Sequence, residues 1–164
     1  GASNSMITMA IDAMVLGKKG YYLGQPAKLH SFAYIPDTAL AFSLLLFAND
    51  TYGQTWHLPV APAVTGNEIM QMATWGATTK YIKPKWQAMP KKNAKIARLF
   101  VPPLRELYEM MYQFENDYVM DCSKFMKRFR SFQVTSYANG IAATLDYAKK
   151  IKATELNRVK KAIN

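Results

Sequence analysis

Apolar and polar positions follow two different spacings along this chain, and together they predict an alternation of helices and strands. In the segment 5–16, apolar residues recur three or four positions apart, as on one face of a helix. Asn4 or Ser5 can cap the start of this helix, and Gly17 can end it. The segment 29–35 alternates instead, with successive side chains on opposite faces, and therefore predicts a strand.

The same criteria predict the remaining elements. Short strands are expected at 21–24, 54–58 and 80–83, with an extended piece at 118–120; helices are expected at 38–48, 66–75, 90–101 and 122–129, from Pro102 onward and after Thr135. Strand, helix and strand in this order indicate an α/β crossover unit rather than an antiparallel meander. We find no repeat, low-complexity tract or linker, so residues 1–164 are expected to form one unit.

Four polar residues predict how three helices begin. Asp37 follows a proline, and its carboxylate is expected to accept the free amide hydrogens in the first turn of helix 38–48. Thr65 and Glu68 have the spacing of a capping box, in which each side chain satisfies a backbone donor of the other. Thr135 is expected to cap the last helix, whose polar end after Lys149 should fray or protrude.

Composition narrows the class of protein. The single cysteine, Cys122, excludes an internal disulfide and fits a reducing compartment, so a cytoplasmic location is expected. The small, polar start 1–5 does not resemble an export signal. The longest apolar run, 39–48, is about half of the roughly 20 residues needed to cross a bilayer, so it predicts a buried helix and no membrane partner.

The formal charge of +10 would favour nucleic acid, acidic membranes or anionic ligands if the cations converged on one face. The cations instead form three groups along the sequence: 80–98, 124–130 and 149–161. Solvated helix faces are the favoured interpretation. The alternative is a basic interaction module, because aromatic residues alternate with lysines between Tyr81 and Trp86, a composition that can bind single-stranded nucleic acid.

Familiar catalytic patterns are incomplete. Glycines at 17, 20 and 24 end a helix and flank a strand, whereas a dinucleotide-binding loop follows a strand and opens a helix. Tyr81 and Lys85 have the Tyr-x-x-x-Lys spacing, but Pro84 between them argues against a shared helical face. No metal site is expected, since the two histidines lack partners at metal-ligand spacing. A triad of Ser31, His57 and Asp37 lacks a nucleophile elbow.

Four segments in order resemble the NAD-dependent epimerase/dehydratase group of the extended short-chain dehydrogenase/reductases. They are GKKGYYLGQPAKLHSFAYIPDTALAF, TWHLPVAPAVTGNEIMQMA, YVMDCSKFMKRF and TSYANGIAATLDYA. The resemblance covers roughly residues 1–150 and implies a fold class: the helix-rich C-terminal, substrate-binding portion of a Rossmann-type enzyme, with a few short strands. The nucleotide loop and the catalytic Tyr/Lys helix are missing from it, which implies that an N-terminal Rossmann domain lies outside this sequence.

The resemblance also implies positions that contact substrate. Asn4 and Ser5 resemble a substrate-loop position, and His30 stands where sugar-nucleotide epimerases often place an arginine on the ligand diphosphate. Residues 111–113, which include Tyr112 and Gln113, lie where a second phosphate-binding arginine often occurs, and no arginine stands there. Against this, Asn4 and Ser5 can be caps, His30 can lie at a strand edge, and Tyr112 can belong to the core.

The implied function is a substrate-binding lobe, inactive alone, of an NAD- or NADP-dependent epimerase, dehydratase or reductase for a nucleotide-sugar or a related alcohol or carbonyl. The parent would transfer hydride with the cofactor, and no cofactor is expected on this fragment alone. Its partners would be the small-molecule substrate, the missing N-terminal half and a second copy. Self-association is expected because helix 5–16 and strand 54–58 would otherwise expose an apolar surface.

Overall fold

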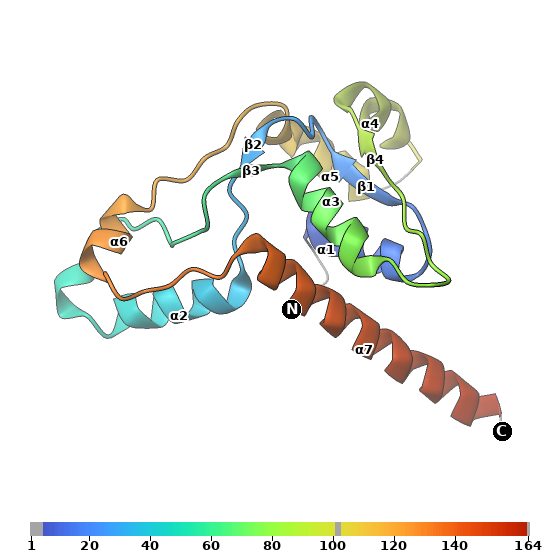
Figure 1. Cartoon of the computed structure of the whole chain (residues 1–164). Helices are drawn as coiled ribbons and strands as arrows, with labels where there is room; N and C mark the ends of the chain where they lie inside the picture. Colours follow the sequence, from blue (N-terminus) through green and yellow to red (C-terminus); the bar gives the residue numbers. More distant parts are fainter. Residues whose placement is uncertain (1–4, 101–102, 164) are drawn as a thin grey trace.

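The structure is a computed structural model that describes residues 5–100 and 103–163 (Figure 1). Its helices are α1 (Met6–Val15), α2 (Ile35–Leu46), α3 (Gly66–Ala77), α4 (Lys91–Ala97), α5 (Pro103–Met110), α6 (Ser123–Arg128) and α7 (Tyr137–Ile163), with 3₁₀ turns η1 (Asn49–Thr51) and η2 (Met111–Phe114). Its strands are β1 (Gly20–Leu23), β2 (Leu29–His30), β3 (Val64–Thr65) and β4 (Trp86–Met89).

The four strands form two small ladders. β1 and β4 pair in parallel, from Gly20 opposite Trp86 to Leu23 opposite Met89. A parallel pair with a helix between its strands does form, but it joins β1 to β4 rather than the strands expected at 54–58 and 80–83. β2 and β3 pair in antiparallel, and β2 also forms a parallel bridge to Tyr118.

Two apolar clusters support the fold at opposite ends of the molecule. The larger lies among α1, β1, α3 and the first half of α7; its fully buried members include Ile11, Met14, Tyr22, Ile69 and Met70. The smaller joins α2 to α6 and the segment after it, around Ala41, Phe125 and Phe132. Figure 1 shows α7 starting between these two parts and extending beyond the body. No helix in the described residues has the length and apolar character needed to cross a membrane.

Two helices begin as local sequence predicts. Ser5 is the N-cap of α1: its Oγ accepts from the backbone nitrogen of Thr8 at 3.2 Å, and Thr8 Oγ1 accepts from the Ser5 nitrogen at 3.1 Å. Thr65 and Glu68 form the expected capping box at α3, with the Thr65 nitrogen 2.7 Å from Glu68 Oε2. That backbone hydrogen bond lowers the pKa of the Glu68 carboxyl below its usual value.

The caps expected at Asp37 and Thr135 are wrong, because these two residues bind each other. Tyr34 precedes α2 without a side-chain cap, and Asp37 lies within the first turn. The Asp37 carboxylate accepts from the Thr135 nitrogen at 2.7 Å and from Thr135 Oγ1 at 2.8 Å. Ser136 takes the capping role at α7, where its Oγ accepts from the Asn139 nitrogen at 3.3 Å. A buried carboxylate thereby connects the start of α2 to the approach to α7.

The strands differ most from expectation. The strand expected at 29–35 has only two residues: residues 31–34 are irregular, and α2 begins at Ile35 with a proline in its first turn. The segment 54–58 is irregular, since no described strand lies beside it, and its apolar side chains pack against the smaller cluster instead. The strand expected at 80–83 forms further along, at 86–89, where β1 offers a pairing partner.

Two glycines permit close approaches that other residues would obstruct. Gly24 has φ +80°, and a Cβ added there would meet the carbonyl of Phe114, so the turn after β1 can lie directly on η2. A Cβ on Gly66 would meet the ring of Tyr22, which is fully buried. These contacts hold β1 against the start of α3 and against η2.

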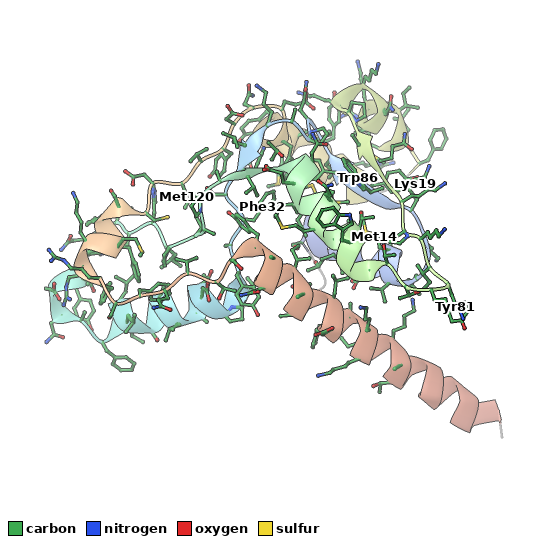
Figure 2. The ribbon with its side chains drawn as sticks, viewed as in Figure 1. Met14, Lys19, Phe32, Tyr81, Trp86 and Met120 are labelled. Atoms are coloured by element: carbon green, nitrogen blue, oxygen red, sulfur yellow. The ribbon has the colours of Figure 1, made fainter. Side chains whose placement is uncertain are left out.

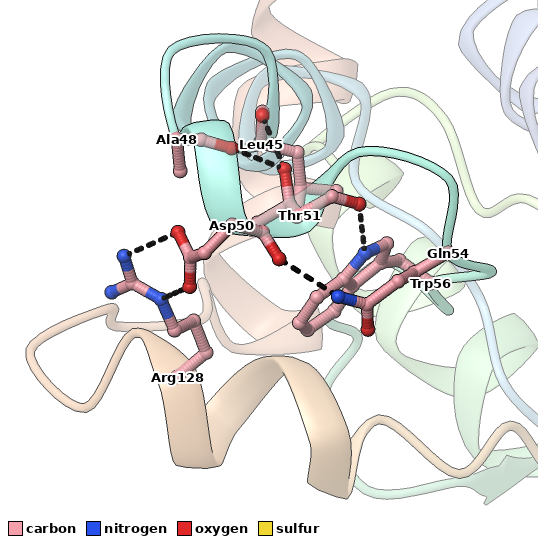
Figure 3. Close-up of polar contacts among 7 residues, drawn as sticks. All are labelled: Leu45, Ala48, Asp50, Thr51, Gln54, Trp56 and Arg128. Carbon is pink, nitrogen blue, oxygen red and sulfur yellow. Dashed lines mark hydrogen bonds and ion pairs between the residues drawn. The ribbon is translucent and has the colours of Figure 1, made fainter.

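Polar contacts fasten α6 to η1 (Figure 3). Arg128 Nε and Nη2 donate to the two carboxylate oxygens of Asp50 at 2.7 and 3.0 Å, which lowers the pKa of Asp50 and raises that of Arg128. Thr51 accepts from Trp56 Nε1 through its carbonyl at 3.0 Å and donates through Oγ1 to Leu45. The end of α2, η1 and α6 are thus tied together without a strand.

Candidate functional site

A groove of about 1200 Å³ lies between α1, the segment 31–36 and the first half of α7. Apolar side chains of all three elements form most of its wall. Its polar lining comes mainly from side chains with hydroxyl groups: Ser5, Thr8, Ser31, Tyr34, Thr135, Ser136, Tyr137, Thr144 and Tyr147. A large apolar cleft with several converging polar groups is the usual form of a small-molecule site.

Phe32 and Tyr137 form one wall of this groove. Figure 2 shows Phe32 near the start of α7, and its ring meets that of Tyr137 edge-on with centroids 6.1 Å apart. The Tyr137 hydroxyl donates to the Ala61 carbonyl at 2.9 Å and accepts from the Phe32 nitrogen at 3.2 Å. Burial is the main cause of the raised pKa of Tyr137. This phenol therefore stays neutral and holds the wall in place.

Of the predicted contact residues, Ser5 lies on the groove. Its hydroxyl is already bonded to Thr8 in the cap, yet the residue is exposed and borders the cavity. Asn4 lies outside the described residues. The N-terminal turn of α1 is therefore placed where a ligand in the groove can reach the Ser5 hydroxyl.

His30 lies one layer behind the groove. It is 4% exposed, and its ring stacks on Phe114, with centroids 5.9 Å apart, and lies near Phe32 and Tyr118. Nε2 has no hydrogen-bond partner. Desolvation lowers the pKa of His30, partly opposed by a backbone hydrogen bond at Asn116 and by the charge of Asp117. The imidazole is thus neutral at pH 7 and meets the groove through Phe32 and Phe114.

Tyr112 and Gln113 lie on η2 beside one another. Gln113 Nε2 and the Tyr112 hydroxyl are 3.2 Å apart, and Tyr112 is 59% exposed. Their neighbour Phe114 lines the groove, whereas these two side chains do not. The structure therefore brings Ser5 to the groove, places His30 behind its wall, and sets Tyr112 and Gln113 on the adjoining surface.

Sequence reasoning missed several groove residues. Ser31 and Thr144 line the cavity from the segment after β2 and from α7, and Ser136 does so from the α7 cap. One feature of the sequence could have indicated a polar site: the run Thr135-Ser136-Tyr137 supplies three adjacent hydroxyl groups at the start of a helix with small residues. From sequence, Thr135 is expected only as a cap, and the convergence of this run with Ser31 depends on tertiary contacts.

The described residues do not form a dinucleotide cradle. Gly17 and Gly24 have φ of +68° and +80° in turns around β1, and neither opens a helix. Tyr81 is 87% exposed in a segment without helix, so it does not share a helical face with Lys85. The three triad candidates have separate partners: Asp37 binds Thr135, Ser31 Oγ accepts from Met120, and His57 Nδ1 lies 3.0 Å from the Asp121 carbonyl. Within residues 5–100 and 103–163, no group of three potential metal ligands occurs.

No protein-family model and no curated protein matches the sequence. The fold does match solved structures. The crystal structure of UDP-glucuronic acid 4-epimerase from Bacillus cereus in complex with NAD has a TM-score of 0.61 and 14% identity, covering 92% of this chain and 41% of that chain. The complex of that epimerase with UDP-glucuronic acid and NAD has a TM-score of 0.63 and 16% identity, covering 91% of this chain and 41% of that chain.

This chain shares its fold with part of that epimerase. It spans about two-fifths of the length of the structures it matches. The expected fold class is confirmed: a helix-rich chain with a few short strands that matches the C-terminal portion of a Rossmann-type epimerase. At these identities the likeness to the epimerase concerns the fold.

Proposed function

We propose that this chain is the substrate-binding lobe of an NAD- or NADP-dependent epimerase, dehydratase or reductase that acts on a nucleotide-sugar or a related alcohol or carbonyl compound. The observation that carries the proposal is the groove between α1, the segment 31–36 and α7. It is a large cavity on a chain whose fold matches two-fifths of an epimerase that binds UDP-glucuronic acid and NAD.

The lining of the groove supports a ligand with both apolar and polar parts. Hydroxyl groups from three elements can hydrogen-bond sugar or ribose hydroxyls, while the apolar wall can pack against a base or a nicotinamide ring. The rigid contacts of Tyr137 with Ala61 and Phe32 would hold the site in shape before a ligand enters.

The described residues do not fit a dinucleotide by themselves, so we assign the cofactor to a Rossmann-type unit that covers the groove. In that arrangement NAD or NADP supplies hydride transfer. This chain contributes binding, orientation and exclusion of water, with Ser5, Asn4, Tyr112 and Gln113 as candidate substrate contacts and His30 as a neutral support behind them.

The first test concerns the reading frame. We expect the codons upstream of Gly1 to encode a glycine-rich strand-loop-helix and a Tyr-x-x-x-Lys helix. The product of the whole frame, saturated with NAD, should bind UDP-glucuronic acid or another UDP-sugar in a calorimetric titration. Ser5→Ala, at the groove, and Gln113→Ala, on the surface beside it, should each weaken binding about tenfold, the loss of one hydrogen bond to a ligand that extends from the groove onto η2. Ser123→Ala and Gln71→Ala, which lie away from both the groove and η2, should leave binding unchanged.

The other candidate function is a non-catalytic basic module for nucleic acid or a protein partner. Several cations are already engaged locally: Lys124 lies 4.2 Å from the Trp56 ring centre, and Arg98 lies 4.3 Å from that of Tyr108. This engagement favours structural roles. An upstream stop codon, together with salt-dependent binding to a single-stranded oligonucleotide, would support the module and contradict the enzyme proposal.

A further inference from the structure

Large apolar side chains are exposed on α4 and in the turn that follows it. At 100° per residue, Ala94, Lys91 and Arg98 share one face, and Lys92, Ile96 and Leu99 share the opposite one. The first face is the one packed on the body: Ala94 is 1% exposed. The second face and the turn after it leave Ile96 65%, Leu99 64% and Phe100 81% exposed.

Besides the buried Ala94, cation contacts attach α4 and the turn after it to α5. Arg98 lies over the ring of Tyr108 on α5, with 4.3 Å to the ring centre, and Lys91 approaches the same ring at 5.7 Å. Arg105 Nε donates to the Arg98 carbonyl at 3.3 Å. These contacts fix the orientation of α4, with Ala94 toward the body and Ile96 toward the surface.

The surroundings of the exposed residues are strongly basic. Lys92 and Lys95 are exposed beside Ile96, and no Asp or Glu occurs in the sequence between Ile69 and Arg105. In Figure 1, α4 lies beside β4 and α5, at an edge of the molecule away from α2. We define Lys92, Lys95, Ile96, Leu99 and Phe100 as the α4 patch.

We propose that the α4 patch binds the surface of a membrane that carries anionic lipids. Ile96, Leu99 and Phe100 would enter the boundary between headgroups and acyl chains, while Lys92 and Lys95 lie against lipid phosphates. The mixture of apolar and cationic side chains favours anionic lipids over nucleic acid as the partner. Phe100 is the one ring in the α4 patch on which a base could stack, whereas Ile96 and Leu99 give no stacking platform and are suited to acyl chains. This surface attachment goes beyond the proposed function, and it replaces the expectation of no membrane partner.

The test uses the full chain with vesicles of phosphatidylcholine, with or without phosphatidylserine, in a sedimentation assay. We expect binding to the phosphatidylserine vesicles and its reduction by salt. Lys92→Glu/Lys95→Glu should weaken binding about twenty-five-fold, at about fivefold per basic residue. Lys18→Glu/Lys150→Glu makes the same change in net charge on other exposed lysines and should have a much smaller effect.

A second pair of variants tests the apolar part. Leu99→Ser/Phe100→Ser should weaken binding to phosphatidylserine vesicles at least tenfold, because the inserted surface is removed. Phe47→Ser, at an exposed residue of 85% exposure on the far part of the molecule, is the matched control and should bind as the unchanged chain does. All four substituted side chains of the α4 patch variants are exposed, so unfolding curves should stay unchanged.

Three outcomes would overturn the proposal. One is the absence of binding to phosphatidylserine vesicles by the unchanged chain. Another is equal weakening by the α4 patch variants and their controls, which would indicate attraction by net charge alone. The third is loss of self-association or of single-stranded oligonucleotide binding in Leu99→Ser/Phe100→Ser without any change in vesicle binding, which would assign the patch to a second copy or to nucleic acid.

Discussion

At the scale of single residues, His30 combines a polar ring with an apolar environment. Its ring lies among Phe32, Phe114 and Tyr118, and Nε2 has no partner in this structure. A buried polar group without a hydrogen bond lowers the free energy of unfolding. Nε2 of His30 therefore destabilises the fold unless a ligand or another segment forms a hydrogen bond with it. His30 is therefore a support whose protonation state affects the stability of the groove wall.

We expect the folded chain to lose stability as pH falls below about 6.5, the ordinary histidine pKa. Burial lowers the pKa of His30 in the folded state, so between the two pKa values the unfolded chain binds more protons than the folded one. The contribution of the neutral ring is complete above the unfolded pKa and decreases as pH falls through it. Urea unfolding at about pH 7.5 and about pH 5 measures the difference.

His30→Phe should reduce this pH dependence and raise stability at acidic pH, since phenylalanine fits an aromatic cluster and carries no proton. The control is His57→Gln, because the other histidine is exposed and bonded to the Asp121 carbonyl. If His30→Phe and the unchanged chain lose stability in parallel on acidification, His30 is not the responsible group.

At the scale of elements, the start of α3 requires a residue without a side chain. Gly66 is the first residue of the helix, and the buried ring of Tyr22 occupies the space that a Cβ would need. The capping box directly before it fixes where the helix begins. β1 and α3 can therefore approach only with glycine at this position.

Gly66→Ala should lower the free energy of unfolding by about 1 to 3 kcal/mol, the usual cost of overpacking a core, even though alanine favours a helix. Thermal and urea unfolding measure the change. In a Tyr22→Leu background the ring is gone, and the additional methyl should cost much less. An equal cost in both backgrounds would contradict a steric clash between these two residues.

The elements also differ in how far sequence alone predicts them. The caps at Ser5 and Thr65 are confirmed because each depends on residues within one turn of the chain. The strand expected at 54–58 is wrong because strand formation requires a neighbouring strand, which no local pattern encodes. Asp37 fits a cap by sequence, but Thr135, 98 residues away, offers two donors to the same carboxylate.

At the scale of the whole molecule, apolar surface is left uncovered on α2 as well as in the groove. Ile35, Phe42 and Leu46 lie on one face of α2 and are 63%, 60% and 51% exposed. Self-association was expected from helix 5–16 and from 54–58. In the structure, the apolar residues of α1 line the groove, and Trp56 and Leu58 pack against the smaller cluster. The exposed apolar face is on α2 instead.

We predict that this chain on its own self-associates through α2. Sedimentation velocity over a range of concentrations should show a dimer, and Phe42→Ser/Leu46→Ser should shift the equilibrium toward monomer at least tenfold because an apolar contact is removed. Val119→Ser, at a residue 60% exposed elsewhere, is the control. A monomer at all concentrations, or the same shift in the control, would contradict the prediction.

The sequence by itself determined the elements whose cause is local: the periodic helices, the capping boxes, the helix-rich class and the presence of Ser5 at the start of α1. The tertiary structure alone decided what depends on distant partners: the extent of the strands, the Asp37–Thr135 contact, the convergence of hydroxyls in the groove and the outward face of α4. The physical reason is that a cap or a helical face satisfies itself within a few residues. A ladder, a buried carboxylate or a cavity instead takes its partners from segments that only folding brings together.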